Sequence, residues 1–120
     1  MKKIIAIALF LGIVIISSVA QAKDSNFLSP DWWENATPQM VENEINNGAN
    51  VKDRDEYGET PLMYAAAFNQ NPEVIETLIK HGTDVKEKDI GGKTALDYAK
   101  ANPNIYQTDA YKLLKDKMDE

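Results

Sequence analysis

The sequence predicts an all-α solenoid of about three helix-turn-helix units with short finger loops, and two observations support this prediction. The segment NVKDRDEYGET at residues 50–60 recurs as DVKEKDIGGKT at residues 84–94, 34 positions later (residue 50 to residue 84). Prolines, glycines and apolar residues outside these segments keep the same spacing, as in the pairs Pro38/Pro72, Val41/Ile75, Ile45/Ile79 and Gly48/Gly82. A period of this length is typical of stacked units, each of which buries its apolar face only against a neighbour.

The repeated segments resemble a known family. Residues 60–67, TPLMYAAA, are similar to the ankyrin signature Thr-Pro-Leu-His-x-Ala-Ala, and residues 73–82 resemble the second helix of the same repeat. A weaker third copy opens with TALDYA at residues 94–99, and its Ala110, Leu113 and Leu114 repeat the apolar positions of Ile75, Leu78 and Ile79. The resemblance runs from about residue 27 to the last residue. It implies an ankyrin-repeat domain at 23–120, with an N-terminal capping repeat at 27–59, a central repeat at 60–93 and a C-terminal capping repeat at 94–120.

Individual elements follow from local signals. Thr60 and Pro61 predict the start of a short inner helix, because the threonine hydroxyl can cap free amides and proline at the first helical position leaves none unpaired. An outer helix is expected from about Pro72 to Gly82, with an apolar stripe at helical spacing. In the first unit Trp32 and Trp33 stand where the central unit has alanines, which indicates a bulky lid with at least one ring in the core.

Three positions depart from the family pattern. Met63 and Asp97 occupy the place where the family usually has histidine, so the hydrogen-bond network that this histidine makes is expected to be absent or rebuilt. Asn69 stands where the family prefers glycine, and asparagine is the next best residue for a left-handed turn.

Residues 1–22 have the pattern of a secretory signal peptide of bacterial style. Lys2 and Lys3 precede an apolar run at 4–16, and an Ala-Gln-Ala sequence ends at Ala22. A retained membrane anchor is the competing interpretation, but the run is shorter than the about 20 apolar residues of a membrane span. We therefore expect cleavage after Ala22, no stable membrane anchor afterwards, and a periplasmic or secreted location.

Charge and composition narrow the functional classes. Without Lys2 and Lys3, residues 23–120 keep all 19 acidic side chains against 11 basic ones, a formal net charge of −8. A field of this sign repels nucleic acid and anionic membranes, so neither partner is expected. With no cysteine and a single histidine, the chain has no Cys-His pair and no histidine cluster, and we expect neither an enzyme nor a cofactor.

Acidic residues crowd the segment at 50–60, where Asp53, Asp55, Glu56 and Glu59 raise the question of a calcium site. The spacing matches a calcium loop only loosely and lacks the bidentate glutamate. Asp55 also recurs as Asp89, and the resemblance implies that this aspartate shapes the finger. A metal site is therefore not predicted.

The resemblance implies a protein-contact surface made of finger tips and the exposed side of the inner helices. The positions that match it are Glu56, Tyr57, Glu59, Ala67, Phe68, His81, Ile90, Gly91 and Lys93. Tyr57, Phe68 and Ile90 are the strongest candidates, because large apolar groups at solvent-facing positions often anchor interfaces. The alternative for these three is local packing, and the alternative for His81 is a solvated residue near a helix C-terminus.

Two functions remain open. The first is a periplasmic or secreted protein that binds one protein partner, of basic or mixed-charge surface, as a non-catalytic adaptor, inhibitor or immunity or accessory factor. The second is an accessory protein for a small ligand, haem or a metal in periplasmic stress defence.

Overall fold

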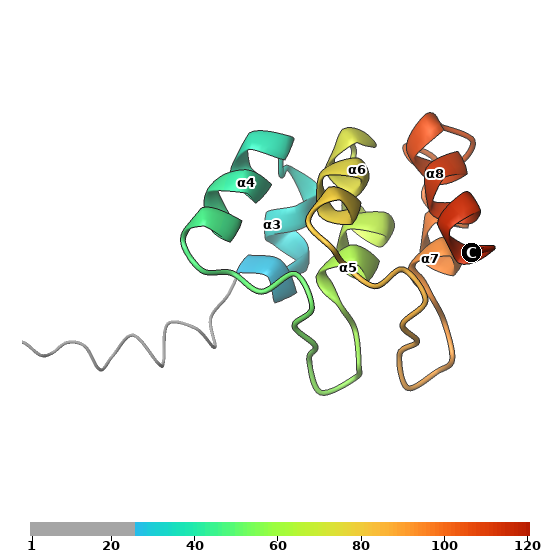
Figure 1. The fold of residues 1–120 in the computed structure, drawn as a ribbon, viewed down its shortest axis with the longest axis horizontal. Coiled ribbons are helices and arrows are strands. Elements are labelled where there is room, and N and C mark those ends of the chain that lie inside the picture. The colour runs from blue at the N-terminus through green and yellow to red at the C-terminus, as the bar shows by residue number, and fades with distance from the viewer. Residues whose placement is uncertain (1–25) are drawn as a thin grey trace, which may run out of the picture.

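The computed structural model describes residues 26–120, so the expected signal peptide and its cleavage site lie outside the described residues. The regular elements of 26–120 are all helical, which confirms the predicted all-α class (Figure 1). In chain order they are η2 (Asn26–Leu28), α3 (Pro30–Glu34), α4 (Pro38–Asn46), α5 (Pro61–Phe68), α6 (Glu73–Lys80), α7 (Ala95–Lys100) and α8 (Asp109–Met118).

The helices stack in two rows. The inner row is α3, α5 and α7, and the outer row is α4, α6 and α8, with neighbours in each row in contact. Two long loops between the units project to the same side of the stack (Figure 1). We call residues 50–60 the first finger and residues 84–94 the second finger. This arrangement is the predicted solenoid.

Threonine is the N-cap residue of most of the longer helices. The hydroxyls of Thr37, Thr60 and Thr108 each accept a hydrogen bond from the backbone amide three residues on, at 3.2 Å. Proline follows Thr37 and Thr60 at the first helical position. At α6 the N-cap is Pro72 itself, and the side chain of Asn71 accepts from the amide of Glu73 at 3.0 Å. The predicted helix starts are therefore confirmed within one residue.

The first unit closes the N-terminal end of the described stack with aromatic rings. Trp33 is completely buried, and its indole Nε1 donates to the carbonyl of Phe27 at 2.8 Å. Trp32 is only half-buried and packs edge-on against Trp33, with ring centroids 4.8 Å apart. The expectation that at least one ring belongs to the core is confirmed.

Asn69 corrects a prediction. Its backbone is extended (φ −78°, ψ 147°) rather than left-handed, and its side chain is completely buried. The carboxamide donates to the carbonyls of Trp33 and Ala36, at 2.5 and 3.0 Å, in the preceding unit. Asn102 repeats this contact one unit later, donating to the carbonyls of Ala66 and Asn69 at 3.0 and 2.8 Å. The side-chain amides of these asparagines therefore link adjacent units by hydrogen bonds, and the turn at Asn69 does not require a positive φ.

The last unit departs slightly from the expected register. Of the two adjacent leucines in α8, Leu114 is completely buried, whereas Leu113 is only partly buried, so Leu114 takes the place of the buried Leu78. The connection between α7 and α8, residues 101–108, is longer than that between α5 and α6, residues 69–72, and it inserts the fully buried Ile105. None of the helices found within 26–120 has the length and apolar character that a membrane span requires.

Candidate functional site

Asp55 organises the first finger. Its Oδ1 accepts from the backbone amides of Tyr57 and Glu59, both at 2.9 Å, and its Oδ2 accepts from the hydroxyl of Tyr64 at 2.6 Å. Burial is the largest single influence and raises the pKa of Asp55, but the hydrogen bonds from Tyr64, Glu59 and Tyr57 together outweigh it and leave the pKa lowered. These bonds confirm that the repeated aspartate shapes the finger.

Asp89 does the same in the second finger. Its Oδ1 accepts from the amides of Gly91 and Lys93, both at 2.9 Å, and its Oδ2 accepts from the hydroxyl of Tyr98. The bond from Tyr98 is the main cause that lowers the pKa of Asp89. Each finger is thus held by an ionised carboxylate that a tyrosine of the following inner helix caps.

These tyrosines rebuild the network that the missing histidine would have made. Met63 is buried, and Asp97 forms a capping box by accepting from the amide of Thr94 at 2.9 Å. The link between helix and finger comes instead from the next residue in each unit, Tyr64 or Tyr98. The pKa of Tyr64 is raised chiefly by burial, and that of Tyr98 chiefly by its bond to Asp89, so both phenols stay protonated donors at neutral pH.

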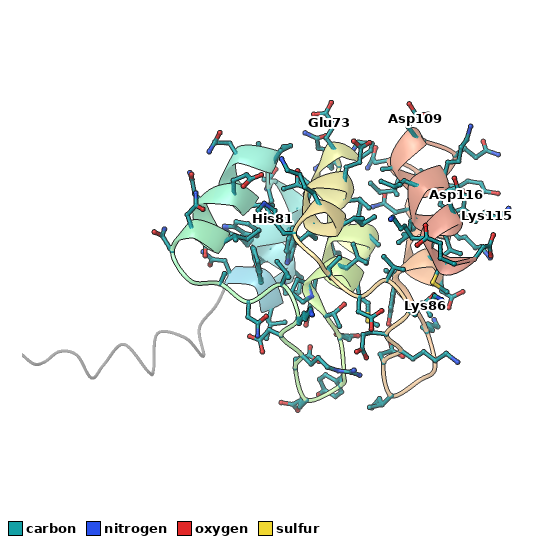
Figure 2. All side chains as sticks on the ribbon, viewed as in Figure 1. Glu73, His81, Lys86, Asp109, Lys115 and Asp116 are labelled. Atoms are coloured by element: carbon teal, nitrogen blue, oxygen red, sulfur yellow. The ribbon has the colours of Figure 1, made fainter. Side chains whose placement is uncertain are left out.

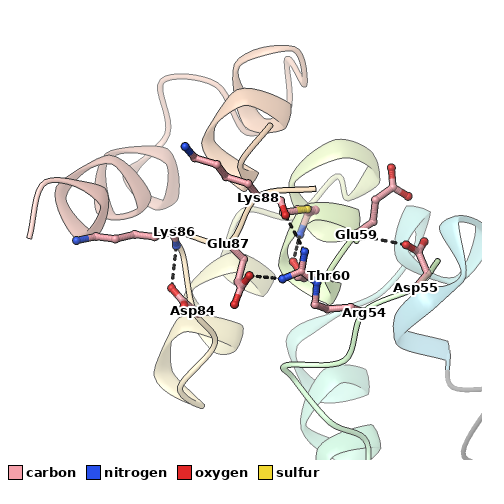
Figure 3. A network of polar contacts seen from close by, with 9 residues as sticks. Arg54, Asp55, Glu59, Thr60, Asp84, Lys86, Glu87 and Lys88 are labelled. Carbon is pink, nitrogen blue, oxygen red and sulfur yellow. Dashed lines mark hydrogen bonds and ion pairs between the residues drawn. The ribbon is translucent and has the colours of Figure 1, made fainter. Parts of the chain in front are cut away.

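The two fingers are joined side by side. The Arg54 guanidinium forms an ion pair with Glu87 and donates to the carbonyl of Lys88 at 2.7 Å, as Figure 3 shows. Near the tips, the amide of Ile90 donates to the carbonyl of Tyr57 at 3.0 Å. Because these contacts link equivalent loops of adjacent units, the fingers form one continuous surface.

The three strongest site candidates are all exposed. Tyr57 and Ile90, at the finger tips, expose 54% and 77% of their surface, and Phe68, the last residue of α5, exposes 45%. Phe68 also stacks on Tyr64, with ring centroids 6.2 Å apart and planes at 29°. Local packing therefore accounts for one face of Phe68 and leaves the other available.

Glu59, Ala67 and Phe68 meet in a groove that runs along α5. The groove encloses about 160 Å³ and is lined by Pro30, Glu59, Met63, Tyr64, Ala67, Phe68 and Tyr98. We call it the α5 groove. Burial, followed by the neighbouring charge of Asp55, raises the pKa of Glu59. Sequence reasoning missed Pro30, Met63, Tyr64 and Tyr98 as part of this surface, although the recurrence of a tyrosine after the histidine position was a usable signal for the two tyrosines.

The other predicted site residues lie at the edges of this surface or away from it. Glu56, Gly91 and Lys93 are exposed on the fingers, and the Lys93 ammonium lies 5.7 Å from the centre of the Tyr98 ring. His81 lies beside the outer helices, well away from the finger tips (Figure 2), with its Nε2 2.9 Å from Glu42 Oε1 of α4. The structure therefore separates His81 from the fingers and gives it a contact between adjacent units.

Two acidic residues of the first finger already accept hydrogen bonds within the described structure. Asp55 is occupied by the finger and Tyr64, while Asp53 accepts from the amide of Arg54 at 3.0 Å. Over residues 26–120, no group of three or more histidine or carboxylate side chains is placed to hold a metal ion.

Comparison with known proteins agrees with this architecture. The family model described as ankyrin repeats (many copies) matches residues 45–99, a span that contains both fingers, α5, α6 and most of α7. No curated protein matches the chain.

Proposed function

We propose that this chain, whose residues 45–99 match the ankyrin-repeat family model, is a non-catalytic adaptor that binds one protein partner across its fingers and inner helices. Ankyrin repeats generally mediate protein–protein interaction. The observation that carries the proposal for this chain is the exposure of Tyr57, Ile90 and Phe68 on a frame whose loops are hydrogen-bonded to one another and to the helices. Large apolar groups held on a rigid frame lose little entropy when they bind, which favours their use as anchors.

The charge of the chain supports a partner with a basic or mixed-charge surface. Residues 23–120 carry a formal net charge of −8, and Glu56 and Glu59 lie on or beside the first finger. Charges at the rim of an interface mainly accelerate association and are screened by salt. We therefore expect an association rate that falls as ionic strength rises.

The proposed location is the periplasm or the exterior, and it rests on the signal-peptide pattern of residues 1–22. An adaptor in that location fits the role of an inhibitor or of an immunity or accessory factor for another exported protein. This role is an analogy of fold and location.

The small-ligand alternative is less well supported by the size of the α5 groove. The α5 groove encloses about 160 Å³, which is smaller than the roughly 300–1,000 Å³ of typical small-molecule sites. Titration of the purified protein with haem, followed by absorbance, tests this alternative directly. A stoichiometric spectral shift would favour it over the adaptor.

The adaptor is tested by affinity capture and then by direct binding. The tagged protein is compared with the double variant Tyr57→Ala/Phe68→Ala and with Tyr106→Ala, a matched control that removes an aromatic side chain 44% exposed on the connection between α7 and α8. Any protein captured is purified and its dissociation constant is measured with all three. The adaptor proposal expects tight binding by the wild type and the control and a loss of at least tenfold in the double variant. Equal affinity for all three folded proteins, or no captured protein at all, would count against it.

A further inference from the structure

The α5 groove has the dimensions and walls of a slot for one long side chain. Met63 and Ala67 supply apolar contact, and the stacked rings of Tyr64 and Phe68 supply an aromatic wall. Glu59 and Tyr98 line the same groove from the finger side and from the next inner helix. An apolar, aromatic slot with a carboxylate matches a side chain that has an apolar stem and a charged head.

Glu59 is the carboxylate of this surface with acceptor capacity to spare. Asp55 and Asp89 each already accept two backbone amides and a tyrosine hydroxyl. The Tyr98 hydroxyl has a single hydrogen and donates it to Asp89, so its 3.5 Å approach to Glu59 Oε2 adds little. Across the part of the chain that the structure describes, the ion pairs formed by Lys, Arg and His side chains do not include Glu59. In Figure 3 its carboxylate extends away from the Arg54 network.

The surroundings of Glu59 favour the arrival of a cation. Burial and the charge of Asp55 raise the pKa of Glu59, the nearby Tyr64 hydroxyl offsets them in part, and the charge of Asp89 adds to the net rise. A bound cation would offset the repulsion between these carboxylates and would also face the negative side of the aromatic rings. We therefore expect the groove to bind a positive charge better than an equally large neutral group.

Among cationic side chains, arginine fits this slot better than lysine. A planar guanidinium stacks on aromatic rings and can donate two parallel hydrogen bonds to one carboxylate, whereas an ammonium is a compact and more strongly hydrated charge. We propose that the α5 groove receives an arginine side chain of the protein partner, with Glu59 as its carboxylate and Tyr64 and Phe68 as its stacking wall. This inference rests on the proposed protein-binding function and names the chemistry that the partner must present.

The groove can be tested before any partner is known. Nα-acetyl-arginine amide is titrated into the isotopically labelled protein and followed by NMR, in parallel with the lysine derivative and with the uncharged arginine isostere citrulline. Saturable shifts are expected at Glu59, Ala67 and Phe68. Arginine should bind at least about tenfold tighter than citrulline, because citrulline can donate hydrogen bonds to Glu59 but lacks the positive charge that strengthens them. Equal binding of arginine and citrulline would overturn the proposal.

A pair of charge-matched variants locates the site. Glu59→Gln removes the carboxylate of the groove, and Glu76→Gln removes an exposed carboxylate of the same type from the outer helix α6. Arginine binding is expected to fall at least tenfold in Glu59→Gln and to be unchanged in Glu76→Gln, with both proteins folded by thermal melting. A similar fall in both variants would show attraction by net charge alone and would refute the slot.

The same variants separate this inference from the adaptor proposal. If the purified partner binds Glu59→Gln as tightly as wild type while Tyr57→Ala/Phe68→Ala has lost it, the adaptor stands and the arginine slot fails. If no partner binds and the arginine derivative still selects Glu59, the adaptor fails and the groove remains a site for a free guanidinium ligand. Both proposals would be established if Glu59→Gln no longer bound the partner and if replacing one partner arginine with citrulline also abolished binding.

Discussion

The two fingers share a frame and differ in what they present. Each is held by an aspartate that accepts two backbone amides and a tyrosine hydroxyl, and each turns at a glycine of positive φ. At the outward positions, Glu59 of the first finger corresponds to Lys93 of the second, and Tyr57 corresponds to Gly91. The repeat therefore conserves the hydrogen bonds that fix the loop and varies the side chains available for recognition.

The fingers also differ in their surroundings. A Cβ added to Gly58 would lie 2.9 Å from the Arg54 guanidinium and 3.3 Å from Asp89 Cα, whereas one added to Gly92 would meet nothing within 4 Å. The second finger covers one flank of the first, and the corresponding flank of the second finger is open. We expect the first finger to tolerate substitution less well.

Alanine at the two turn glycines should show the largest difference between the fingers. Gly58 and Gly92 have φ values of 77° and 82°, so alanine at either costs about 1–2 kcal/mol of folding free energy. Gly58→Ala also crowds the Asp89 backbone, which adds about 1–3 kcal/mol. Urea unfolding of both variants measures the difference. Equal losses would show that the second finger moves aside without cost.

Removing the tyrosine hydroxyls should give the next largest effect. Tyr64→Phe is expected to lower stability by about 1.5–3 kcal/mol, because the hydrogen bond is made to an ionised and partly buried group. Tyr98→Phe is expected to lower it by about 1 kcal/mol, because burial affects Asp89 less than Asp55. Urea unfolding at neutral pH measures both.

The pH dependence of the stability lost in Tyr64→Phe is a control for the role of the Asp55 carboxylate. The pKa of Asp55 is lowered in the fold, so its contribution is complete above the ordinary value of 3.8 and is lost as the pH falls through the folded-state pKa. The cost of Tyr64→Phe should therefore shrink at acid pH. A loss that is independent of pH would mean that the hydroxyl acts through packing and not through the carboxylate.

Breaking the bridge between the fingers should have a smaller effect. Arg54→Ala removes the ion pair with Glu87, whose two side chains are 40% and 38% exposed, and one hydrogen bond to a carbonyl. We expect a loss of about 0.5–1.5 kcal/mol in the free energy of unfolding, and this loss should decrease as salt is added. Lys88→Ala, the equivalent change in the second finger, is the matched control and should change stability by less than about 0.5 kcal/mol. Equal effects of the two changes would show that the bridge does not stabilise the first finger.

The smallest expected effect is a gain in stability. Glu59→Gln should raise the melting temperature slightly at neutral pH, because the raised pKa of Glu59 means that its ionised form disfavours the fold. A carboxyl with a raised pKa contributes stability at acid pH that is lost as the pH rises through that pKa, so the gain in the variant should grow with pH. Lys93→Gln, at the equivalent position, should show no such trend. A lower melting temperature in Glu59→Gln at every pH would contradict this assignment.

Much of the fold was accessible from the sequence. The recurrence of residues 50–60 at residues 84–94 predicted the stack, threonine and proline predicted the helix starts, and Trp33 was recognised as part of a bulky cap. Asp55 recurs as Asp89, and the resemblance to the ankyrin family implied the role of this aspartate in the finger. These features are readable because helix capping and turn formation depend on residues a few positions apart, and a repeat displays each of them more than once.

Only the tertiary structure decided how the units are joined and where the α5 groove lies. Asn69 looked like a turn residue, yet its amide reaches carbonyls 36 and 33 positions earlier in the chain. Tyr64 occupied a variable position of the repeat, yet its hydroxyl completes the first finger and its ring lines the groove with Glu59 and Phe68. Such contacts depend on the distance and rotation between adjacent units. Packing over the whole stack sets that geometry, so a local pattern of residues does not encode it.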